Sequence, residues 1–190
     1  HVRMVYRKSA VNLLIAGLGI FLLIWLSIRD IIPLMKEIIP DIIDNNIKVI
    51  TNAGGVNPVA CRNAIFDIAA KMGYQGLKIG IVHGDDIYDR IDGLLEQKIN
   101  LNHMDTGESL ETVKNCVYSA NVYFGAKAVA DALRDGAQII ITGRVTDTGL
   151  TLAPMMHEFE WDPADYDKMA TGIVAGHIIE CGAQVSGGNF

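Results

Sequence analysis

From residue 29 to about residue 181, the apolar positions of the chain follow two alternating spacings. In residues 30–45 the apolar side chains recur three and four positions apart, which is typical of a helix with one apolar face. Residues 48–51 form a short β-branched run instead, which is typical of a strand. Because this change of spacing recurs along the chain, the sequence predicts alternating helices and strands.

Capping and breaking residues set the bounds of the predicted elements. Asn57 suits an N-cap, and Pro58 suits the first helical position, where a missing N–H costs nothing. Gly136 suits the left-handed cap that ends a helix, and Pro40 is expected to kink or break the first one. We expect helices at 30–45, 58–72, 87–96, 121–134, 148–159 and 164–181, strands at 48–51, 77–82 (buried) and 138–142, and a polar surface excursion at 101–112.

This alternation predicts an α/β fold with a parallel, Rossmann-like, doubly wound sheet that is covered by helices on both faces. The chain has 190 residues, which suits one domain with a substantial core. We therefore expect a single α/β domain over residues 29–190, preceded by a separate hydrophobic segment over residues 1–28.

The segment from Ala10 to Ile28 has nineteen residues and no charged side chain. As a helix it is nearly long enough to cross a bilayer, and Arg7 and Lys8 would hold its N-terminal end in the cytoplasm. The alternative is a core strand, with LLIAGLG entering a glycine turn, followed by a helix. A third alternative is an aberrant start, because the first residue is His rather than Met.

Charge and cysteine content exclude some classes of protein. Sixteen Lys and Arg against 22 Asp and Glu give a formal net charge of −6, with no basic cluster beyond Arg3, Arg7 and Lys8. A nucleic-acid-binding surface would need such a cluster. The three cysteines are widely spaced and fit neither a zinc site nor a disulfide framework, so we expect reduced thiols and a cytoplasmic location.

Three predicted strands end in loops that carry glycine, acidic residues or arginine, at residues 52–57, 83–86 and 143–147. Parallel strands bring such loops to the carboxyl edge of a sheet, where the next helices direct unpaired N–H groups and where ligands bind. We therefore expect the function of this chain to lie in these three loops, on one rim of the sheet.

In the first loop, Gly54 and Gly55 would allow the backbone to approach a ligand closely, and the helix after Asn57 would present free N–H groups. Asn52 would add a side-chain hydrogen bond. This pattern favours an anionic ligand, although it matches neither the GxGxxG fingerprint nor the Walker A loop. A purely structural tight turn is the alternative.

In the third loop, Gly143 is followed by Arg144, whose planar donors suit a carboxylate or a phosphate. Asp147 would cap the next helix, orient the arginine or transfer a proton. In the second loop, Asp85 and Asp86 would hold a divalent metal through oxygen ligands, or one of them would act as a base. The alternative is that one acid caps the next helix and the other faces water.

These residues lie in a segment, from about Ile47 to Phe190, that resembles the AtuA-like acyclic terpene utilization family. The resemblance rests on the strings TNAGGVNP, GDD, ANVYFGAKAVADALRDGAQIIITGRVTDTGLTLAPMMHEFEW and AGHIIECGAQVSGGNF. It implies a cytoplasmic protein in the catabolism of acyclic terpenoids such as citronellol and geraniol, whose intermediates are branched acyl-CoA thioesters. Family members also have a glycine-rich N-terminal strand and loop, which residues 1–26 lack, and they extend beyond the GGNF end. We therefore expect a fragment or an aberrant version, incomplete at both ends.

Two hypotheses of different class follow. The first is an enzyme, or an enzyme subunit, that holds a small anionic ligand such as an acyl-CoA through Asn52, Gly54, Gly55, Asn57, Gly143 and Arg144, with Asp85, Asp86 or Asp147 for proton transfer. The second is a non-catalytic ligand-binding or scaffold module, tethered to a membrane through residues 10–28. Both leave the reaction, any metal and any cofactor open, and we expect a homo-oligomer or a subunit of a larger assembly.

Overall fold

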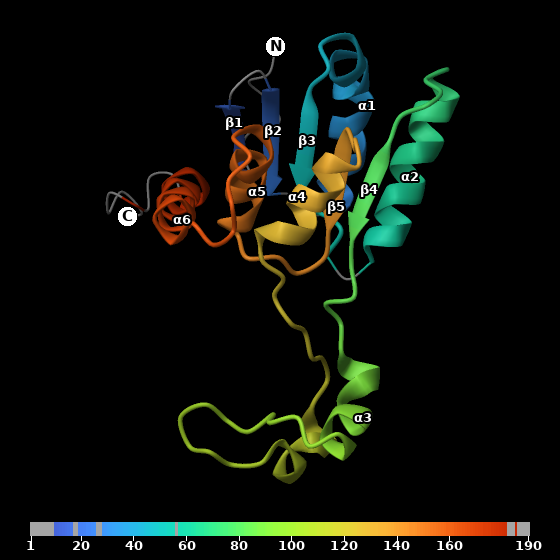
Figure 1. Ribbon diagram of the computed structural model, residues 1–190. Helices are drawn as coiled ribbons and strands as arrows, with labels where there is room; N and C mark the ends of the chain where they lie inside the picture. The colour runs from blue at the N-terminus through green and yellow to red at the C-terminus, as the bar shows by residue number, and fades with distance from the viewer. Residues whose placement is uncertain (1–9, 17–18, 26–27, 56, 182–184, 186–190) are drawn as a thin grey trace.

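The computed structural model of the protein describes residues 10–16, 19–25, 28–55, 57–181 and 185 (Figure 1). Within them, helices and strands alternate along most of the chain. Five strands are found, β1 (Ala10–Ala16), β2 (Gly19–Trp25), β3 (Lys48–Thr51), β4 (Ile79–Val82) and β5 (Ile139–Thr142). The α-helices among the described residues are α1 (Ile28–Asp44), α2 (Pro58–Lys71), α3 (Ile91–Glu96), α4 (Ala126–Arg134), α5 (Gly149–Glu158) and α6 (Tyr166–Cys181).

The strands form one sheet in the order β1-β2-β3-β5-β4. The pairs β2–β3, β3–β5 and β5–β4 are parallel, and β1 pairs with β2 in the antiparallel direction. The last strand in sequence, β5, therefore lies between β3 and β4. Val49 pairs with Ile139 on one side of β5, and Val82 pairs with Thr142 on the other. The carboxyl ends of β3, β5 and β4 consequently meet at one edge of the sheet.

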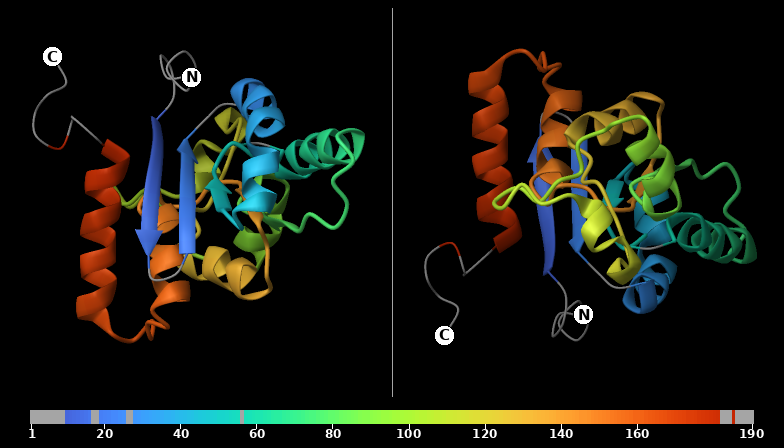
Figure 2. Two further views of the ribbon diagram at one scale, coloured as in Figure 1. Left: turned by 90° about the horizontal axis from the view of Figure 1, so that it is seen from above. Right: turned by 90° about the horizontal axis from the view of Figure 1, so that it is seen from below.

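Helices cover both faces of the sheet, as the sequence predicted (Figures 1 and 2). On one face, α1 and α2 pack against Val49, Ile139 and Ile141. On the other face, α4 and α5 pack against Ile50 and Ile140. Helix α6 lies against α5 and also contacts β1. A largely parallel sheet with helices on both faces is a Rossmann-like α/β fold. The helices are needed on each face because the central strands are continuous apolar runs that must be buried on both sides.

The predicted break at Pro40 is wrong, since α1 runs through both Pro33 and Pro40. Its apolar face is completely buried, with Ile31, Met35 and Ile39 at 0% exposure. Ile42, at 1% exposure, extends this face, and burial of each of the four side chains contributes about 1.5–3 kcal/mol. Together they match or exceed the cost of the two prolines, which is roughly 3 kcal/mol each. Tertiary packing therefore keeps this helix continuous.

The helix predicted to begin at Asn121 begins at Ala126 instead. The preceding segment is extended because its backbone bonds to the loops after β4 and β5. The N–H of Val122 donates to the Asp85 carbonyl at 2.8 Å, and the N–H of Phe124 donates to the Arg144 carbonyl at 3.1 Å. The prediction of a buried strand at residues 77–82 also needs correction. β4 is an edge strand, and Val82 is its one fully buried member.

The N-terminal apolar segment forms strands rather than the spanning helix that was one of its alternatives. Residues Ala10–Ala16 and Gly19–Trp25 are β1 and β2, so the alternative of a strand followed by a helix is correct for its first element and wrong for its second, and residues 17–18, where the glycine turn was expected, lie outside the described residues. Among the described residues, no helix is both long enough and apolar enough to cross a membrane.

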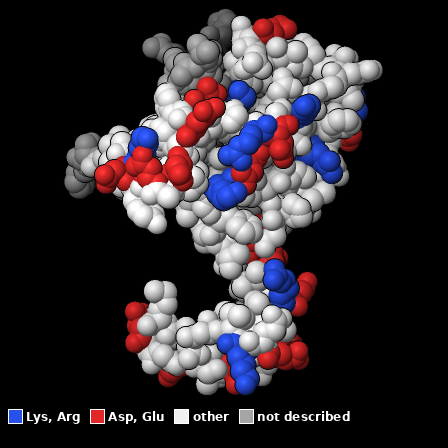
Figure 3. All heavy atoms as spheres, in the orientation of Figure 1, with Lys and Arg blue, Asp and Glu red and all other residues white. Residues whose placement is uncertain are grey.

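Residues 87–120, which we call the arm, extend away from the sheet and its helices (Figure 1). The arm includes α3 and three short 3₁₀ turns, and it contains the surface excursion expected at residues 101–112. At its base the Ile87 N–H donates to the Ala120 carbonyl at 2.8 Å. Figure 3 shows the arm as a separate lobe, and it shows acidic and basic side chains interspersed over the visible face of the body.

Candidate functional site

The connections of the sheet create a natural crevice between β3 and β5. The loop after β3 leads to α2, on one face, whereas the loop after β5 leads to α5, on the other face. Two neighbouring parallel strands whose loops turn to opposite faces leave a gap at their carboxyl ends, and this is where open α/β sheets bind ligands. Two of the three loops singled out from the sequence flank this gap.

A small hollow of about 110 Å³ lies at this position. We call it the switch-point hollow. The β3 loop and the β5 loop provide most of its lining, and the extended segment that returns from the arm to α4 provides one aromatic ring. The lining residues are Asn52, Gly55, Tyr123, Gly143, Arg144, Val145 and Asp147.

The two glycines of the β3 loop have different roles. Gly55 lines the hollow with a φ of +47°, and a Cβ there would meet nothing within 4 Å. Gly54 is buried, and a Cβ there would lie 2.5 Å from the carbonyl oxygen of Thr142 and 2.8 Å from Pro58 Cβ. Gly54, predicted as a ligand residue, therefore allows the ends of β3 and β5 to pack closely, and it is not part of the lining.

Asn57 is committed to capping α2, as the sequence predicted. Its side-chain oxygen accepts the N–H of Ala60 at 2.9 Å. Pro58 has no N–H, so the first turn of α2 offers fewer free donors than the sequence suggested. Asn57, predicted as a ligand residue, does not line the hollow, whereas Asn52 does.

Arg144 faces the hollow without a carboxylate partner. Its guanidinium carbon lies 6.0 Å from the centroid of the Tyr123 ring, within the range of a cation–π contact. In the described part of the chain it makes no hydrogen bond and no ion pair, and the same holds for the side chain of Asn52. Both side chains are thus available to a ligand.

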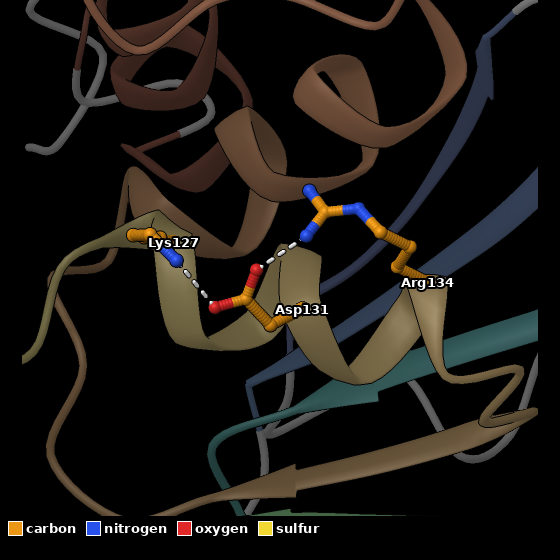
Figure 4. A network of polar contacts seen from close by, with 3 residues as sticks. All are labelled: Lys127, Asp131 and Arg134. Carbon is orange, nitrogen blue, oxygen red and sulfur yellow. Dashed lines mark hydrogen bonds and ion pairs between the residues drawn. The ribbon is translucent and has the colours of Figure 1, made fainter.

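Arg134 on α4 shows what a structural arginine looks like in this protein (Figure 4). Its Nη1 lies 2.6 Å from Asp131 Oδ1, and Lys127 Nζ lies 2.7 Å from the other carboxylate oxygen. These two cations lower the pKa of the Asp131 carboxyl. Arg134 is thus paired with a carboxylate of its own helix, whereas Arg144 has no carboxylate partner among the described residues, and this difference supports a role in ligand binding for Arg144.

Asp147 lines the hollow and does not cap α5. The N-cap residue of α5 is Thr148, and no side chain caps this helix. Partial burial raises the pKa of the Asp147 carboxyl, the nearby Glu180 raises it further, and Arg144 opposes the rise. Because no side chain caps α5, the alternative in which Asp147 caps this helix is wrong. Asp147 and Arg144 line one hollow without forming an ion pair.

Asp85 and Asp86 lie beside the hollow rather than in its lining. Asp85 is 5% exposed, accepts a hydrogen bond from Asn121 Nδ2 at 3.2 Å, and packs so closely on Gly143 that a Cβ there would overlap its carboxylate. Asp86 accepts the N–H of Tyr88 at 3.0 Å, just before the 3₁₀ turn Tyr88–Arg90, but the N-cap position of that turn is Ile87, so the alternative in which one acid caps the next helix is wrong. Asp85 is buried, which contradicts the expectation that the second acid faces water.

Tyr123 and Val145 line the hollow but were not among the site residues predicted from the sequence. Tyr123 reaches the hollow because the extended segment before α4 pairs with the β5 loop through an isolated bridge between Phe124 and Val145. No local pattern around Tyr123 could have revealed this, since the pairing joins segments that are distant in sequence. A scan of strand-end loops would have included Val145, which directly follows Arg144.

The described residues provide no assembled metal centre. Among them, no three His, Cys, Asp or Glu side chains lie close enough together to hold an ion. The polar groups that the hollow offers are one guanidinium, one carboxylate, one amide and the phenol of Tyr123. This set can bind an anion at Arg144 and exchange a proton at Asp147.

Comparison with known proteins identifies the family. No curated protein and no solved structure matches this chain. The family model described as "Acyclic terpene utilisation family protein AtuA" matches residues 28–190, which span α1, the sheet from β3 onward and all three loops. The chain therefore belongs to the AtuA family of acyclic terpene utilisation proteins.

Proposed function

We propose that this chain binds the anionic head group of an acyclic terpenoid acid, or of its acyl-CoA thioester, in the switch-point hollow and acts in the catabolism of such compounds. The family supports a role in acyclic terpene utilisation. Degradation of a terpenoid chain as an acid or a thioester supplies the anion, either a carboxylate or a phosphate. The proposal depends on one observation, which is the unpaired Arg144 in a hollow between two strand ends.

The charge of Arg144 favours an anionic ligand. A guanidinium binds a carboxylate or a phosphate through two parallel N–H donors, and hydrogen bonds to charged groups contribute about 1.5–3 kcal/mol. Asn52 adds a neutral donor and acceptor, and the absence of a Cβ at Gly55 leaves the backbone accessible. These groups come from both sides of the crevice, so a ligand between them would contact β3 and β5 loops together.

The size of the hollow limits which part of the ligand it holds. Sites that enclose a whole ligand have volumes of about 300–1,000 Å³, well above the 110 Å³ found here. The hollow therefore suits a head group, and the branched hydrocarbon chain would extend over its rim. Asp147, whose pKa is raised by partial burial, is the group suited to proton exchange with the bound head group.

Calorimetric titration tests the proposal. The chain would be titrated with short branched carboxylic acids, with their CoA thioesters and with CoA alone, so that carboxylate and phosphate binding are separated. Arg144→Ala should weaken binding by about 10- to 100-fold, the equivalent of one charged hydrogen-bonding group. Arg134→Ala is the matched control, because Arg134 is an exposed arginine on α4 that does not line the hollow.

Two results would contradict the proposal. The first is the absence of binding for every acid and thioester by a protein whose circular dichroism shows it to be folded. The second is binding that Arg144→Ala and Arg134→Ala leave equally unchanged, because the anion would then bind elsewhere.

A further inference from the structure

The switch-point hollow contains both a cation and an acid, and these two side chains do not neutralise each other. Arg144 and Asp147 both belong to its lining, yet no ion pair joins them. The carboxylate of Asp147 also accepts no hydrogen bond from any described residue. A ligand bound beside Arg144 would therefore face an unused carboxylate within the same small volume.

A plain carboxylate ligand fits this arrangement poorly. Its negative charge would be attracted by Arg144 and repelled by the like charge of Asp147, since like charges in one site disfavour each other. A hydrogen-bond donor close to the ligand's carboxylate changes this repulsion into a charge-assisted hydrogen bond to Asp147. The hollow is small, at about 110 Å³, which suits a carboxylate and the carbons next to it rather than a whole ligand.

Resting on the proposed function, we propose that the ligand is a hydroxy acid in which a hydroxyl lies one or two carbons from the carboxylate. Arg144 binds the carboxylate, and Asp147 accepts the hydrogen bond of the hydroxyl. Asp147 is thus the residue that determines specificity, by selecting hydroxylated over unsubstituted acids.

A hydroxyl fits Asp147 better than an ammonium group. Arg144 lines the same hollow as Asp147, so the guanidinium would repel the like charge of an ammonium group bound there. A neutral hydroxyl bonds to the Asp147 carboxylate without this repulsion. Terpenes are hydrocarbons whose catabolism introduces oxygen, so hydroxyl groups arise naturally on their carbon chains, whereas amines do not.

The test compares matched acids that differ by one group. Isothermal titration would measure 3-methylbutanoate, 2-hydroxy-3-methylbutanoate, 3-hydroxy-3-methylbutanoate and 3-amino-3-methylbutanoate against the full chain. At least one hydroxy acid should bind about tenfold more tightly than the unsubstituted acid, the effect expected for one hydrogen bond to a charged group. Asp147→Ala should abolish this preference and leave the unsubstituted acid bound as tightly as before, or more tightly.

Two variants keep the result interpretable. Asp67→Ala removes an exposed acid of α2 that does not line the hollow, and it should leave the hydroxyl preference unchanged. Arg144→Ala should weaken all of the acids together. If the hydroxylated and unsubstituted acids bind equally and Arg144→Ala weakens both, the proposed function stands and the inference about the hydroxyl is wrong. Tighter binding of the amino acid than of either hydroxy acid would also overturn the inference. If none of the four acids binds, both the proposed function and the inference about the hydroxyl are wrong.

Discussion

Adding one methyl group at Gly54 is expected to destabilise the fold by about 3 kcal/mol, the upper part of the range for overpacking a well-packed core. The new Cβ would lie 2.5 Å from the Thr142 carbonyl oxygen and 2.8 Å from both Ile141 Cγ2 and Pro58 Cβ. Each of these atoms is held rigidly. One belongs to the β5 backbone, one to a side chain with 0% exposure, and one to the ring that begins α2.

Urea unfolding followed by circular dichroism would measure the free energy of unfolding of Gly54→Ala and of the unchanged protein. Gly55→Ala is the matched control, because that Cβ would meet nothing within 4 Å but would occupy a φ of +47°. It should cost about 1 kcal/mol, from backbone strain alone. If Gly54→Ala unfolds at the same urea concentration as the unchanged protein, the close contact between the ends of β3 and β5 does not exist.

Three smaller predictions concern buried and capping groups. Thr151→Val should stabilise the protein by about 1 kcal/mol in thermal unfolding, because the buried Thr151 hydroxyl has no partner among the described residues. Thr142→Val is the control, and it should not stabilise the protein because it loses a hydrogen bond to the Gly143 carbonyl. Asn57→Ala should cost about 1 kcal/mol by removing the α2 cap, and Asn57→Ser should restore most of it. The raised pKa of Asp147 means that its ionisation opposes folding, so stability falls as pH rises from the usual carboxyl pKa through the raised native value. Asp147→Asn should therefore be more stable than the unchanged protein at neutral pH, with a difference in urea midpoint that disappears near the usual carboxyl pKa; a constant difference would contradict the assigned cause.

Local patterns were sufficient for much of the fold because they depend on neighbouring residues. The run at residues 48–51 became β3 with the predicted bounds, and Asn57 and Pro58 began α2 as predicted. Local patterns failed where contacts between residues distant in sequence determine the local structure. Pro40 lies inside α1 because its apolar face is buried, and Asn121 is extended because it pairs with the β4 loop.

The candidate site shows the same division. Asn52, Gly55, Gly143, Arg144 and Asp147 were all identified as strand-end residues, and all of them line the hollow. Asp85 is also a strand-end residue, but its carboxylate is packed against Gly143 and does not line the hollow. Its position after β4 could not reveal this, because burial depends on residues that are distant in sequence. Tyr123 had no such signal, because it does not follow a strand, and α4 and β5 separate it from the β5 loop in sequence.

The sequence by itself determined that the chain is an α/β protein with polar loops at the ends of its strands, because periodicity, caps and turn residues act over a few positions. Tertiary structure alone decided that β5 lies between β3 and β4, and therefore that Arg144 faces Asn52 across a crevice. The reason is physical: β-branched runs of similar length and hydrophobicity can pair with one another in any order. The order is selected by the helices that must cover both faces, and this depends on the whole chain at once.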